Sequence, residues 1–565
     1  MNNVPSRLLL FITVALSVMA LYFLHANRFK LWYDETVQLS ISHGSHPETF
    51  QPYVYGVDPA TVVSLNQRYN MDPGGYSLFL NILSPIVGRH FYIYRIINIL
   101  AYLTGVSLIL LMLLRTFGMS RPHAIMLTIC GYLIFLMLSR RVLIRIPGLD
   151  RWVLDQGFGL FPFYSLLKRA FIIRSYGFEV LFISFVLFMG SWFANRNVKG
   201  PMVILTSMML GILLTRYDFS IFVFCYFGAL ALYVRVWSAW KELIRSKWTW
   251  IFSISILTSL YLLYIYSYSH QTAGVGTPIR LPYLADSYLD SLRNWRFVFG
   301  QPRNILASVM FATAILHILS RTADFLEYIY ITVFIGYLSL SVLGLHPFNF
   351  SLSQCSAMII MMDVLLVKWV LGMLSAFRNN KSISRMAQII ISDRLRYSRL
   401  IFTFLLSAWV VASEFSTKRV DALISSILAG PEATTGVFDK TIDSVLVSNM
   451  GAKIFIDLSA ITNIKCFYSL SGRPIPANDY RFEMLGPHSQ QFIQVTGISE
   501  RFENAIQSQC DLYYVPELIS NNAQRKKFAT LGFVESPSCK HLYTRAQGSI
   551  RDTGQSLGEV SVFGK

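Results

Sequence analysis

"LLLFITVALSVMALYFLHANRFKLWYDET", residues 8–36, joins a long apolar run to an acidic pair. The run over 8–26 has the length of about 20 residues that a helix needs to cross a bilayer. Trp32 and Tyr33 follow it, and amphipathic rings of this kind settle at the headgroup level. The stretch therefore predicts a membrane-spanning helix followed at once, at the membrane surface, by the carboxylates of Asp34 and Glu35.

Composition extends this prediction to the whole chain. The 565 residues are 54% hydrophobic and only 14% charged, with a mean hydropathy of +0.47, whereas soluble proteins carry about 25% charged residues. The net charge of +18 lies mostly in short loops between apolar runs, where topology and anionic lipids place Lys and Arg. We expect a multi-pass membrane protein that contacts membrane lipids and does not bind nucleic acid.

The apolar runs predict about eleven transmembrane helices in residues 1–415. They lie near 8–26, 93–114, 122–138, 176–193, 201–215, 219–235, 249–268, 304–320, 328–345, 355–376 and 400–414. Basic loops such as 377–399 fall, with one exception, on the side of the N-terminus, which the positive-inside rule assigns to the cytoplasm. The first external loop, 27–92, then carries the acidic pair, and the C-terminus is extracytoplasmic.

One external loop has the wrong charge for this topology. Residues 139–174 carry seven basic residues against two acids, Asp150 and Asp155. Either the helix count is wrong by one or the positive charge is held outside to meet an anionic ligand.

The chain changes character beyond about residue 416. Predicted strands are "GAKIFIDLS" (451–459), "CDLYYVPEL" (510–518), "FVES" (533–536) and "HLYTRA" (541–546), and predicted helices are "ERFENAIQSQ" (500–509) and "NNAQRKKFATLG" (521–532). Alternating strands and helices predict an extracytoplasmic α/β domain over 416–547 with a partly parallel sheet. The remaining segment, 548–565, is rich in Gly and Ser and is predicted to be disordered.

The acidic pair is the first candidate for chemistry. Leu31, Trp32, Tyr33, Val37 and Leu39 surround it in the sequence, so it is expected at an interface where charge is costly. Adjacent like charges also disfavour joint ionisation, which can leave one carboxylate as a poised base. A solvated structural pair is the alternative.

Four further stretches follow in order. They are "DPGGYSLFLNIL" (72–83), "FYIYRIINIL" (91–100), "FIIRSYGFEVLFISF" (171–185) and "LLTRYDFSIF" (213–222). With "WYDET" (32–36) after the first helix, this series resembles the GT-C glycosyltransferases, which include protein O-mannosyltransferases and lipid A aminoarabinose transferases. The chain departs from that pattern at Gly74, where a second Pro is usual, at Ile172 and Ile173, and at Arg216 in place of His. Near the late helices, "LHPFNFSLSQ" (345–354) stands where the family has an Arg-Tyr pair, so the resemblance covers about the first 230 residues.

The resemblance implies a reaction and its residues. The donor would be a polyprenyl-phosphate sugar, either a hexose or a pentose, and the acceptor a cell-envelope glycan, lipid or protein outside a bacterial inner (plasma) membrane. Asp34 would be the general base, a role that contributes about 10²–10⁴ in rate, with Glu35 as a second catalytic candidate. Planar guanidinium groups would stabilise the leaving phosphate with inversion at the sugar. The donor-phosphate candidates are Arg174, Tyr176, Arg95, Arg141 and Arg216, and the acceptor or loop candidates are Asp72 and Tyr76.

No cofactor is clearly implied. A divalent metal could involve His270 and His346, with His46 as a further external histidine, but lone loop histidines are usually not ligands. A transporter or flippase of lipid-linked sugars is one alternative, for which Asp363 and Lys368 are the clearest mid-helix charges; they could pair or snorkel. An O-antigen ligase-like enzyme, which would use a lipid diphosphate, is the other alternative.

Overall fold

The computed structural model is mostly helical. It describes residues 4–24, 31, 33–46, 51–70, 72–115, 122–146, 160–193, 199–216, 219–233, 302–342, 355–376, 396–415, 440–456, 458–471, 474–482, 510–514, 532–537 and 542–545, with isolated positions at 245, 247, 250, 254, 258, 272–273, 277–278 and 529.

Apolar helices recur throughout the described part of the first 415 residues. They are α1 (Val4–Leu24), α5 (Tyr92–Arg115), α6 (Pro122–Leu143), α9 (Tyr176–Phe193), α10 (Lys199–Leu214), α11 (Phe219–Leu232), α16 (Pro302–Leu319), α17 (Phe325–Val342), α18 (Ser356–Ala376) and α20 (Arg396–Phe415). Each coincides with a predicted span, whereas the span expected near 249–268 lies largely outside the described residues. Five of the described helices, α5, α6, α16, α17 and α18, are long and apolar enough to cross a membrane, as expected of an integral membrane protein.

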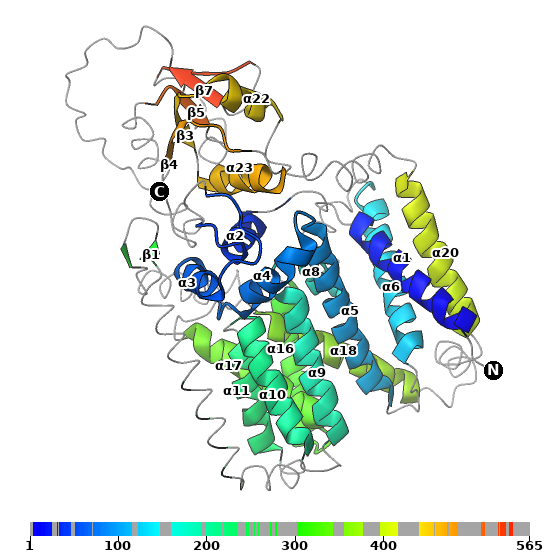
Figure 1. Ribbon diagram of the computed structural model, residues 1–565. Helices are drawn as coiled ribbons and strands as arrows, with labels where there is room; N and C mark the ends of the chain where they lie inside the picture. Colours follow the sequence, from blue (N-terminus) through cyan, green and yellow to red (C-terminus); the bar gives the residue numbers. More distant parts are fainter. Residues whose placement is uncertain are drawn as a thin grey trace.

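The helices form two groups. Helices α1, α6 and α20 pack on one another at one side of the molecule, while α5, α9, α10, α11, α16, α17 and α18 make up the larger bundle (Figure 1). One continuous cluster of buried apolar side chains runs through both groups.

Small residues allow the bundle helices to approach closely. A Cβ on Gly177 would lie 2.3 Å from the backbone oxygen of Asn98, and one on Gly105 would lie 2.9 Å from the backbone of Leu181. The backbones of α5 and α9 are therefore in contact near the N-terminus of α9, as in membrane helices with small residues at their interface.

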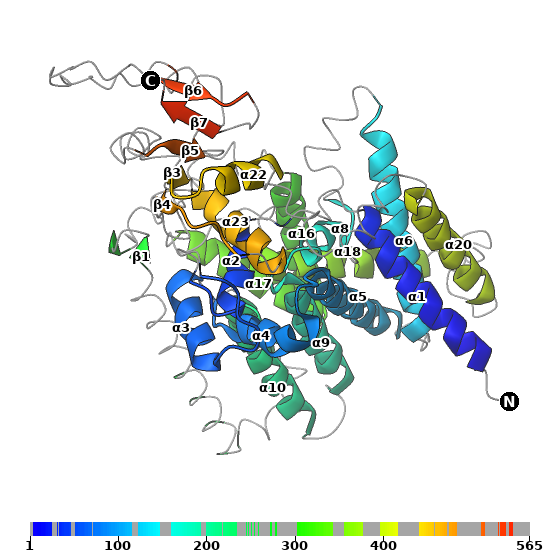
Figure 2. The same ribbon diagram turned by 45° about the horizontal axis from the view of Figure 1, so that its top comes forward.

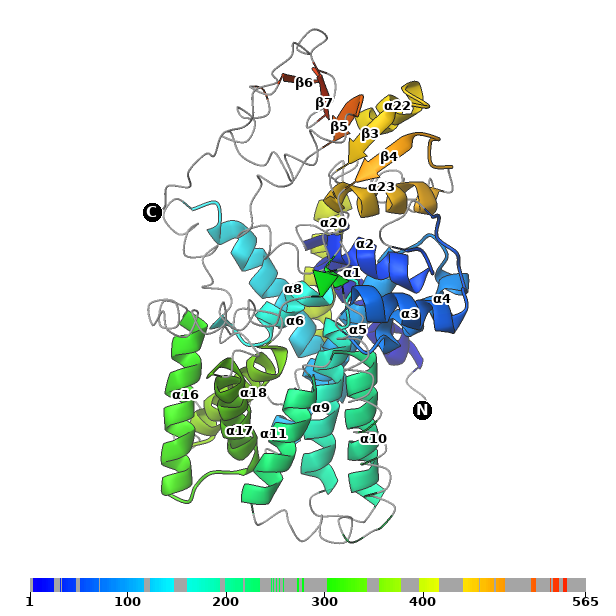
Figure 3. The ribbon, with the colours of Figure 1, turned by 90° about the vertical axis from the view of Figure 1, so that its left-hand side faces the viewer.

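Short helices from the first predicted external loop cover one end of the bundle. These are α2 (Tyr33–Ser42), α3 (Pro59–Tyr69) and α4 (Gly75–Val87), and Figure 3 shows them lying at the upper ends of α9 and α10. At 13 residues α4 is shorter than a span and its first residue, Gly75, packs on the backbone of Leu213 at the end of α10. A further short helix, α8 (Tyr164–Ala170), lies within the predicted basic loop.

The C-terminal region contains a five-stranded mixed sheet in the order β4-β3-β5-β7-β6. Its elements are α22 (Lys440–Ser448), β3 (Lys453–Ile456), α23 (Leu458–Ser471), β4 (Asp479–Phe482), β5 (Leu512–Tyr514), β6 (Phe533–Glu535) and β7 (Leu542–Arg545). Strand β3 is parallel to both β4 and β5, while β7 is antiparallel to its neighbours. The four predicted strands and the partly parallel sheet are confirmed. The helix expected at 500–509, most of the helix expected at 521–532, and the tail beyond 547 lie outside the described residues.

Helix α23 joins this sheet to the helical region. It lies between the sheet and α2 (Figure 2), and its face toward α2 is buried. Lys465 Nζ donates to the backbone oxygen of His46 at 2.6 Å, and Tyr53 N donates to Ser469 Oγ at 3.1 Å. The shared apolar cluster includes Cys466 and Leu470 from α23 and Leu31, Leu39 and Tyr53 from the first loop.

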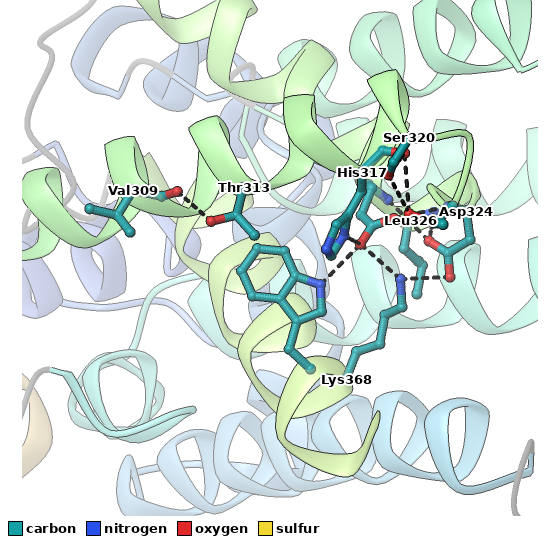
Figure 4. Close-up of polar contacts among 10 residues, drawn as sticks. Val309, Thr313, His317, Ser320, Asp324, Leu326 and Lys368 are labelled. Atoms are coloured by element: carbon teal, nitrogen blue, oxygen red, sulfur yellow. Dashed lines mark hydrogen bonds and ion pairs between the residues drawn. The ribbon is translucent and has the colours of Figure 1, made fainter. Parts of the chain in front are cut away.

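A polar cluster lies where the end of α16 and the start of α17 meet the middle of α18 (Figure 4). Lys368 Nζ lies 2.8 Å from Asp324 Oδ2 and 3.2 Å from Glu327 Oε1, and His317 Nδ1 lies 2.8 Å from the same Glu327 oxygen. The suggestion that Asp363 and Lys368 pair is therefore wrong. Asp363 Oδ2 instead accepts a hydrogen bond from Phe163 N at 2.8 Å.

We expect Gly177→Ala to weaken the α5–α9 contact, because the added Cβ would meet a backbone oxygen that cannot move aside. Overpacking of this kind costs about 1–3 kcal/mol. Thermal unfolding of the purified protein in detergent measures the loss. Gly372→Ala in α18 is the matched control, since nothing lies within 4 Å of its added Cβ; equal melting temperatures for the two variants would contradict the close packing.

Candidate active site

The site is organised by a buried ion pair between Glu35 of α2 and Arg95 of α5. Arg95 Nε donates to Glu35 Oε1 at 2.9 Å and Nη2 donates to Oε2 at 2.6 Å, so the guanidinium grips the carboxylate at two points. The two side chains are 2% and 0% exposed. Charges removed from water this far are stable only when geometry and hydrogen bonding are both good, and the bidentate contact fixes α2 against α5.

The same pair holds the turn that carries Arg174. Ile173 N donates to Glu35 Oε1 at 2.8 Å. One turn along α5 from Arg95, Asn98 Nδ2 donates to the backbone oxygens of Ile172 (2.7 Å) and Arg174 (2.9 Å). The backbone of 172–174 is thus fixed from two sides, which sets the direction in which the Arg174 side chain leaves the chain.

Tyr76 of α4 completes this anchor. Its hydroxyl donates to Asn98 Oδ1 at 3.1 Å, and its ring is 2% exposed. Burial, the largest effect, raises the pKa of this hydroxyl far above its ordinary value of 10.0. Tyr76 therefore acts as a neutral hydrogen-bond donor that ties α4 to α5.

The Arg174 guanidinium meets two side-chain amides. Its Nη1 donates to Gln38 Oε1 at 3.3 Å and to Asn70 Oδ1 at 3.2 Å. Gln38 belongs to α2 and Asn70 caps the end of α3, so the arginine links α2 and α3 to the 172–174 turn.

A chain of neutral side chains supports these amides. Gln38 Nε2 donates to Ser77 Oγ (2.6 Å), Ser77 Oγ donates to Asn66 Oδ1 (2.7 Å), and Asn66 Nδ2 donates to the backbone oxygen of Asp72 (2.8 Å). All are buried. Because each bond orients the next partner, the network holds the amide oxygens toward Arg174.

Asp72 adds a carboxylate to this arrangement. It is 6% exposed, and Gly74 N donates to its Oδ1 at 3.1 Å. Gly74 has a φ of 90°, which favours glycine and explains why no proline occupies this position. Burial raises the pKa of Asp72 above its ordinary value, and the charges of Arg174 and Arg216 and a hydrogen bond with Asn66 oppose that rise.

Arg216 stands beside the other aromatic candidate. Its guanidinium carbon lies 5.7 Å from the centre of the Tyr176 ring, within the range of a cation–π contact. Since its charge also acts on Asp72, Arg216 and Arg174 give this site two cations beside one buried carboxylate.

The structure brings most of the predicted site residues together from separate parts of the sequence. Those linked by the contacts above are Glu35, Asp72, Tyr76, Arg95, Arg174, Tyr176 and Arg216. Arg141 contacts a different part of the fold, because its Nη2 donates to the backbone oxygen of Phe23 at 2.9 Å.

Several candidates cannot be placed as side chains. Asp34 lies in the first turn of α2, but its side chain, like the whole of His270 and His346, lies outside the described residues. His46 is described through its backbone oxygen, which accepts from Lys465. Among the residues that the structure describes, no group of three or more His, Cys, Asp or Glu side chains could hold a metal ion.

The amide side chains are the part of the site that the sequence prediction omitted. Gln38, Asn66 and Asn70 are neutral and belong to no recognised motif. Their spacing carried a signal, since Asn66 and Asn70 are four residues apart and share one helical face of "SLNQRYN" (64–70).

No family model matches the chain, and comparisons with curated proteins and with solved structures give no match.

Glu35→Gln should destabilise the protein strongly, because it leaves the buried Arg95 charge without its carboxylate. Breaking such a pair costs about 3–5 kcal/mol. The double variant Glu35→Leu/Arg95→Met, which removes both charges, should recover part of the melting temperature measured in detergent. A loss below about 1 kcal/mol for Glu35→Gln would mean that the pair does not hold α2 in place.

The stability contributed by Asp72 should depend on pH. Because its pKa is raised in the folded state, the folded protein holds this proton more tightly than the unfolded chain, and ionisation above the ordinary value of 3.8 reduces the free energy of unfolding. Asp72→Asn removes that loss, so the melting temperature of the variant minus that of the wild type should become more positive from pH 4 to pH 7. A difference that stays constant or falls would show that the carboxylate is not held in a desolvated position.

Proposed function

We propose that the protein is a multi-pass membrane glycosyltransferase of the GT-C type, which transfers a sugar from a polyprenyl-phosphate donor to an extracytoplasmic acceptor. One observation carries the proposal: Arg174, held by amides of α2 and of the end of α3, and Arg216, stacked on Tyr176, are two cations suited to phosphate whose charges both act on the buried Asp72. Cations can stabilise the charge of a leaving phosphate, and a neighbouring carboxylate can bind a hydroxyl group. The reaction requires both.

Asp34 is the proposed general base. It precedes Gln38 by four residues in α2, so its backbone lies on the helical face that carries Gln38, the partner of Arg174. In the proposed step the acceptor hydroxyl loses its proton to Asp34 while its oxygen bonds to the anomeric carbon. The bond from that carbon to the phosphate oxygen breaks, its electron pair stays on the phosphate, and attack from the opposite side inverts the sugar.

The other residues are given supporting roles. Arg174 and Arg216 would neutralise charge on the departing phosphate, and Asp72 would hydrogen-bond a sugar or acceptor hydroxyl. Glu35 and Arg95 are already bonded to one another, which favours a positioning role for both. The hydrogen bond from Ile173 N to Glu35 places the pair behind the turn that carries Arg174.

The proposal includes a topology. Eleven spans with a cytoplasmic N-terminus would put α2, α3, α4, the site and the C-terminal α/β domain outside the cytoplasm, in a bacterial inner membrane. Glu35 and Tyr76 belong to α2 and α4, and these helices, with α3, cover one end of the bundle (Figure 3). A lipid-linked donor in the outer leaflet would present its phosphate at that level.

The test is envelope-glycan analysis of a deletion strain complemented with single variants. Asp34→Asn should reduce the restored glycan by about 10² or more, because it keeps the shape and removes the base. Arg174→Ala should be comparably defective, and Arg174→Lys should recover only part, since an ammonium lacks the two-pronged grip on phosphate.

Arg145→Ala is the matched control, because Arg145 is exposed just beyond the end of α6 and its loss removes the same charge. It should restore wild-type glycan. Full restoration by Asp34→Asn at wild-type membrane levels would contradict the proposed base, and an unchanged glycan profile in the deletion strain itself would contradict the proposed function and favour a transport role.

A further inference from the structure

Asn66, in the last turn of α3, is the residue at which two hydrogen-bonded paths from Arg174 meet. On the first path, Arg174 Nη1 donates to Asn70 Oδ1 at 3.2 Å, and Asn70 Nδ2 donates to Asn66 Oδ1 at 3.2 Å. On the second, Arg174 Nη1 donates to Gln38 Oε1 at 3.3 Å, and Gln38 Nε2 donates to Ser77 Oγ at 2.6 Å. Ser77 Oγ then donates to Asn66 Oδ1 at 2.7 Å. Both paths therefore end on one amide oxygen.

The nitrogen of the same amide holds the loop that carries Asp72. Asn66 Nδ2 donates to the backbone oxygen of Asp72 at 2.8 Å. The Asp72 side chain is fixed separately, because Gly74 N donates to its Oδ1 at 3.1 Å. Asn66 itself is fully buried. One side chain thus links the cation Arg174, through its amide oxygen, to the segment of the carboxylate Asp72, through its amide nitrogen.

The chemistry of this position accounts for an asparagine. An amide offers an acceptor and donors on one short side chain, whereas an ionised carboxylate of the same size only accepts. The surroundings are also tight, since a Cβ on Gly74 would lie 3.1 Å from Asn66 Nδ2 and 3.3 Å from its Cγ. Gly74 therefore supplies both the φ of 90° that the 72–74 turn adopts and the room that the amide occupies.

The two linked groups have different tasks in the proposed reaction. Arg174 would hold the donor phosphate, and Asp72 would bind a hydroxyl group. Neutral hydrogen bonds that orient one another set the place of each group relative to the other. Reacting atoms must be held about 3–3.5 Å apart and in line, and a misplacement of about 1 Å can cost about 10²-fold in rate. Transfer would therefore depend on the separation of Arg174 and Asp72.

We propose that Asn66 is a positioning residue that fixes Asp72 relative to Arg174. A hydroxyl group bound to Asp72 then meets the sugar whose phosphate lies against Arg174. The inference rests on the proposed function and adds to it a residue that acts through two others.

Asn66→Ala in the full-length protein is the first test. The variant should lower the glycan restored to the deletion strain by about 10²-fold, because the two groups lose their fixed separation. Purified in detergent, it should bind polyprenyl phosphate within about threefold of the wild type, as measured by native mass spectrometry, since Gln38 and Asn98 still hold Arg174. Donor binding that is kept while transfer is lost is the signature of positioning.

Asn81→Ala is the matched control. Asn81 of α4 is also buried, and its Nδ2 also donates to a backbone oxygen, that of Val57, at 2.8 Å. Among the contacts that the structure describes, its side chain lies on neither path from Arg174. Thermal unfolding should show comparable losses for Asn81→Ala and Asn66→Ala, but Asn81→Ala should restore wild-type glycan. If Asn66→Ala does not fold, the milder Asn66→Ser carries the test.

A double variant separates positioning of Asp72 from a general effect. If Asn66 acts through Asp72, removing the carboxylate leaves nothing for Asn66 to position. Asn66→Ala added to Asp72→Asn should then lower the restored glycan by less than about twofold further, although alone it costs about 10²-fold. A loss in the double variant equal to the product of the two single losses would show independent effects and overturn the inference.

Two other results would overturn it. One is restoration of glycan by the folded Asn66 variant to the level reached by Asn81→Ala. The other is a loss of polyprenyl phosphate binding as large as that in Arg174→Ala, which would confine Asn66 to donor binding. Failure of the proposed function has a different signature, namely an unaltered glycan in the deletion strain or polyprenyl phosphate binding that Arg174→Ala leaves unchanged.

Discussion

The buried pair of Glu35 and Arg95 is the constraint on which the candidate site depends. A carboxylate and a guanidinium in a largely apolar setting are costly to desolvate, and they repay that cost only when nearly every hydrogen-bonding position is used. Here the carboxylate is used twice by Arg95 and once more by Ile173 N. The geometry admits one arrangement of α2, α5 and the 172–174 turn, so the pair provides specificity of position more than stability. The amides around Arg174 can form a network because these three segments are already fixed.

Much of the helical region was predictable from the lengths of the apolar runs, since a span must have about 20 such residues whatever its neighbours are. The short helices α2 and α3 were not, because they lie in a polar loop whose composition resembles that of an irregular segment. The acidic pair illustrates the difference. As adjacent letters, Asp34 and Glu35 look like one functional unit, but successive residues on a helix are about 100° apart. Glu35 faces α5 and bonds to Arg95, so its role differs from the one proposed for Asp34. The sequence prediction did not include helix α2, and it is this helix that turns the two side chains in different directions.

The basic segment 139–174 shows that a count of charges does not predict which partner each side chain meets. Its excess of Arg and Lys pointed to an anionic ligand, but the side chains have different partners. Arg141 donates to a backbone oxygen near the end of α1, whereas Arg174 donates to amides of the first loop. The fold, and not the number of charges in the segment, determines which partner each arginine meets.

The contact between α23 and α2 has a consequence for the order in which the protein is made. Lys465 and its acceptor, the backbone oxygen of His46, are 419 residues apart, and ribosomes add roughly 5–20 residues per second. Helix α2 therefore leaves the ribosome roughly 20–80 s before the helix that covers it is synthesised. During that interval the apolar face formed by Leu31, Leu39 and Tyr53 lacks Cys466 and Leu470. A nascent chain can thus pack its bundle helices first and cover the apolar face of the first loop with α23 last. The surroundings of the candidate site are therefore complete only after most of the chain has been translated.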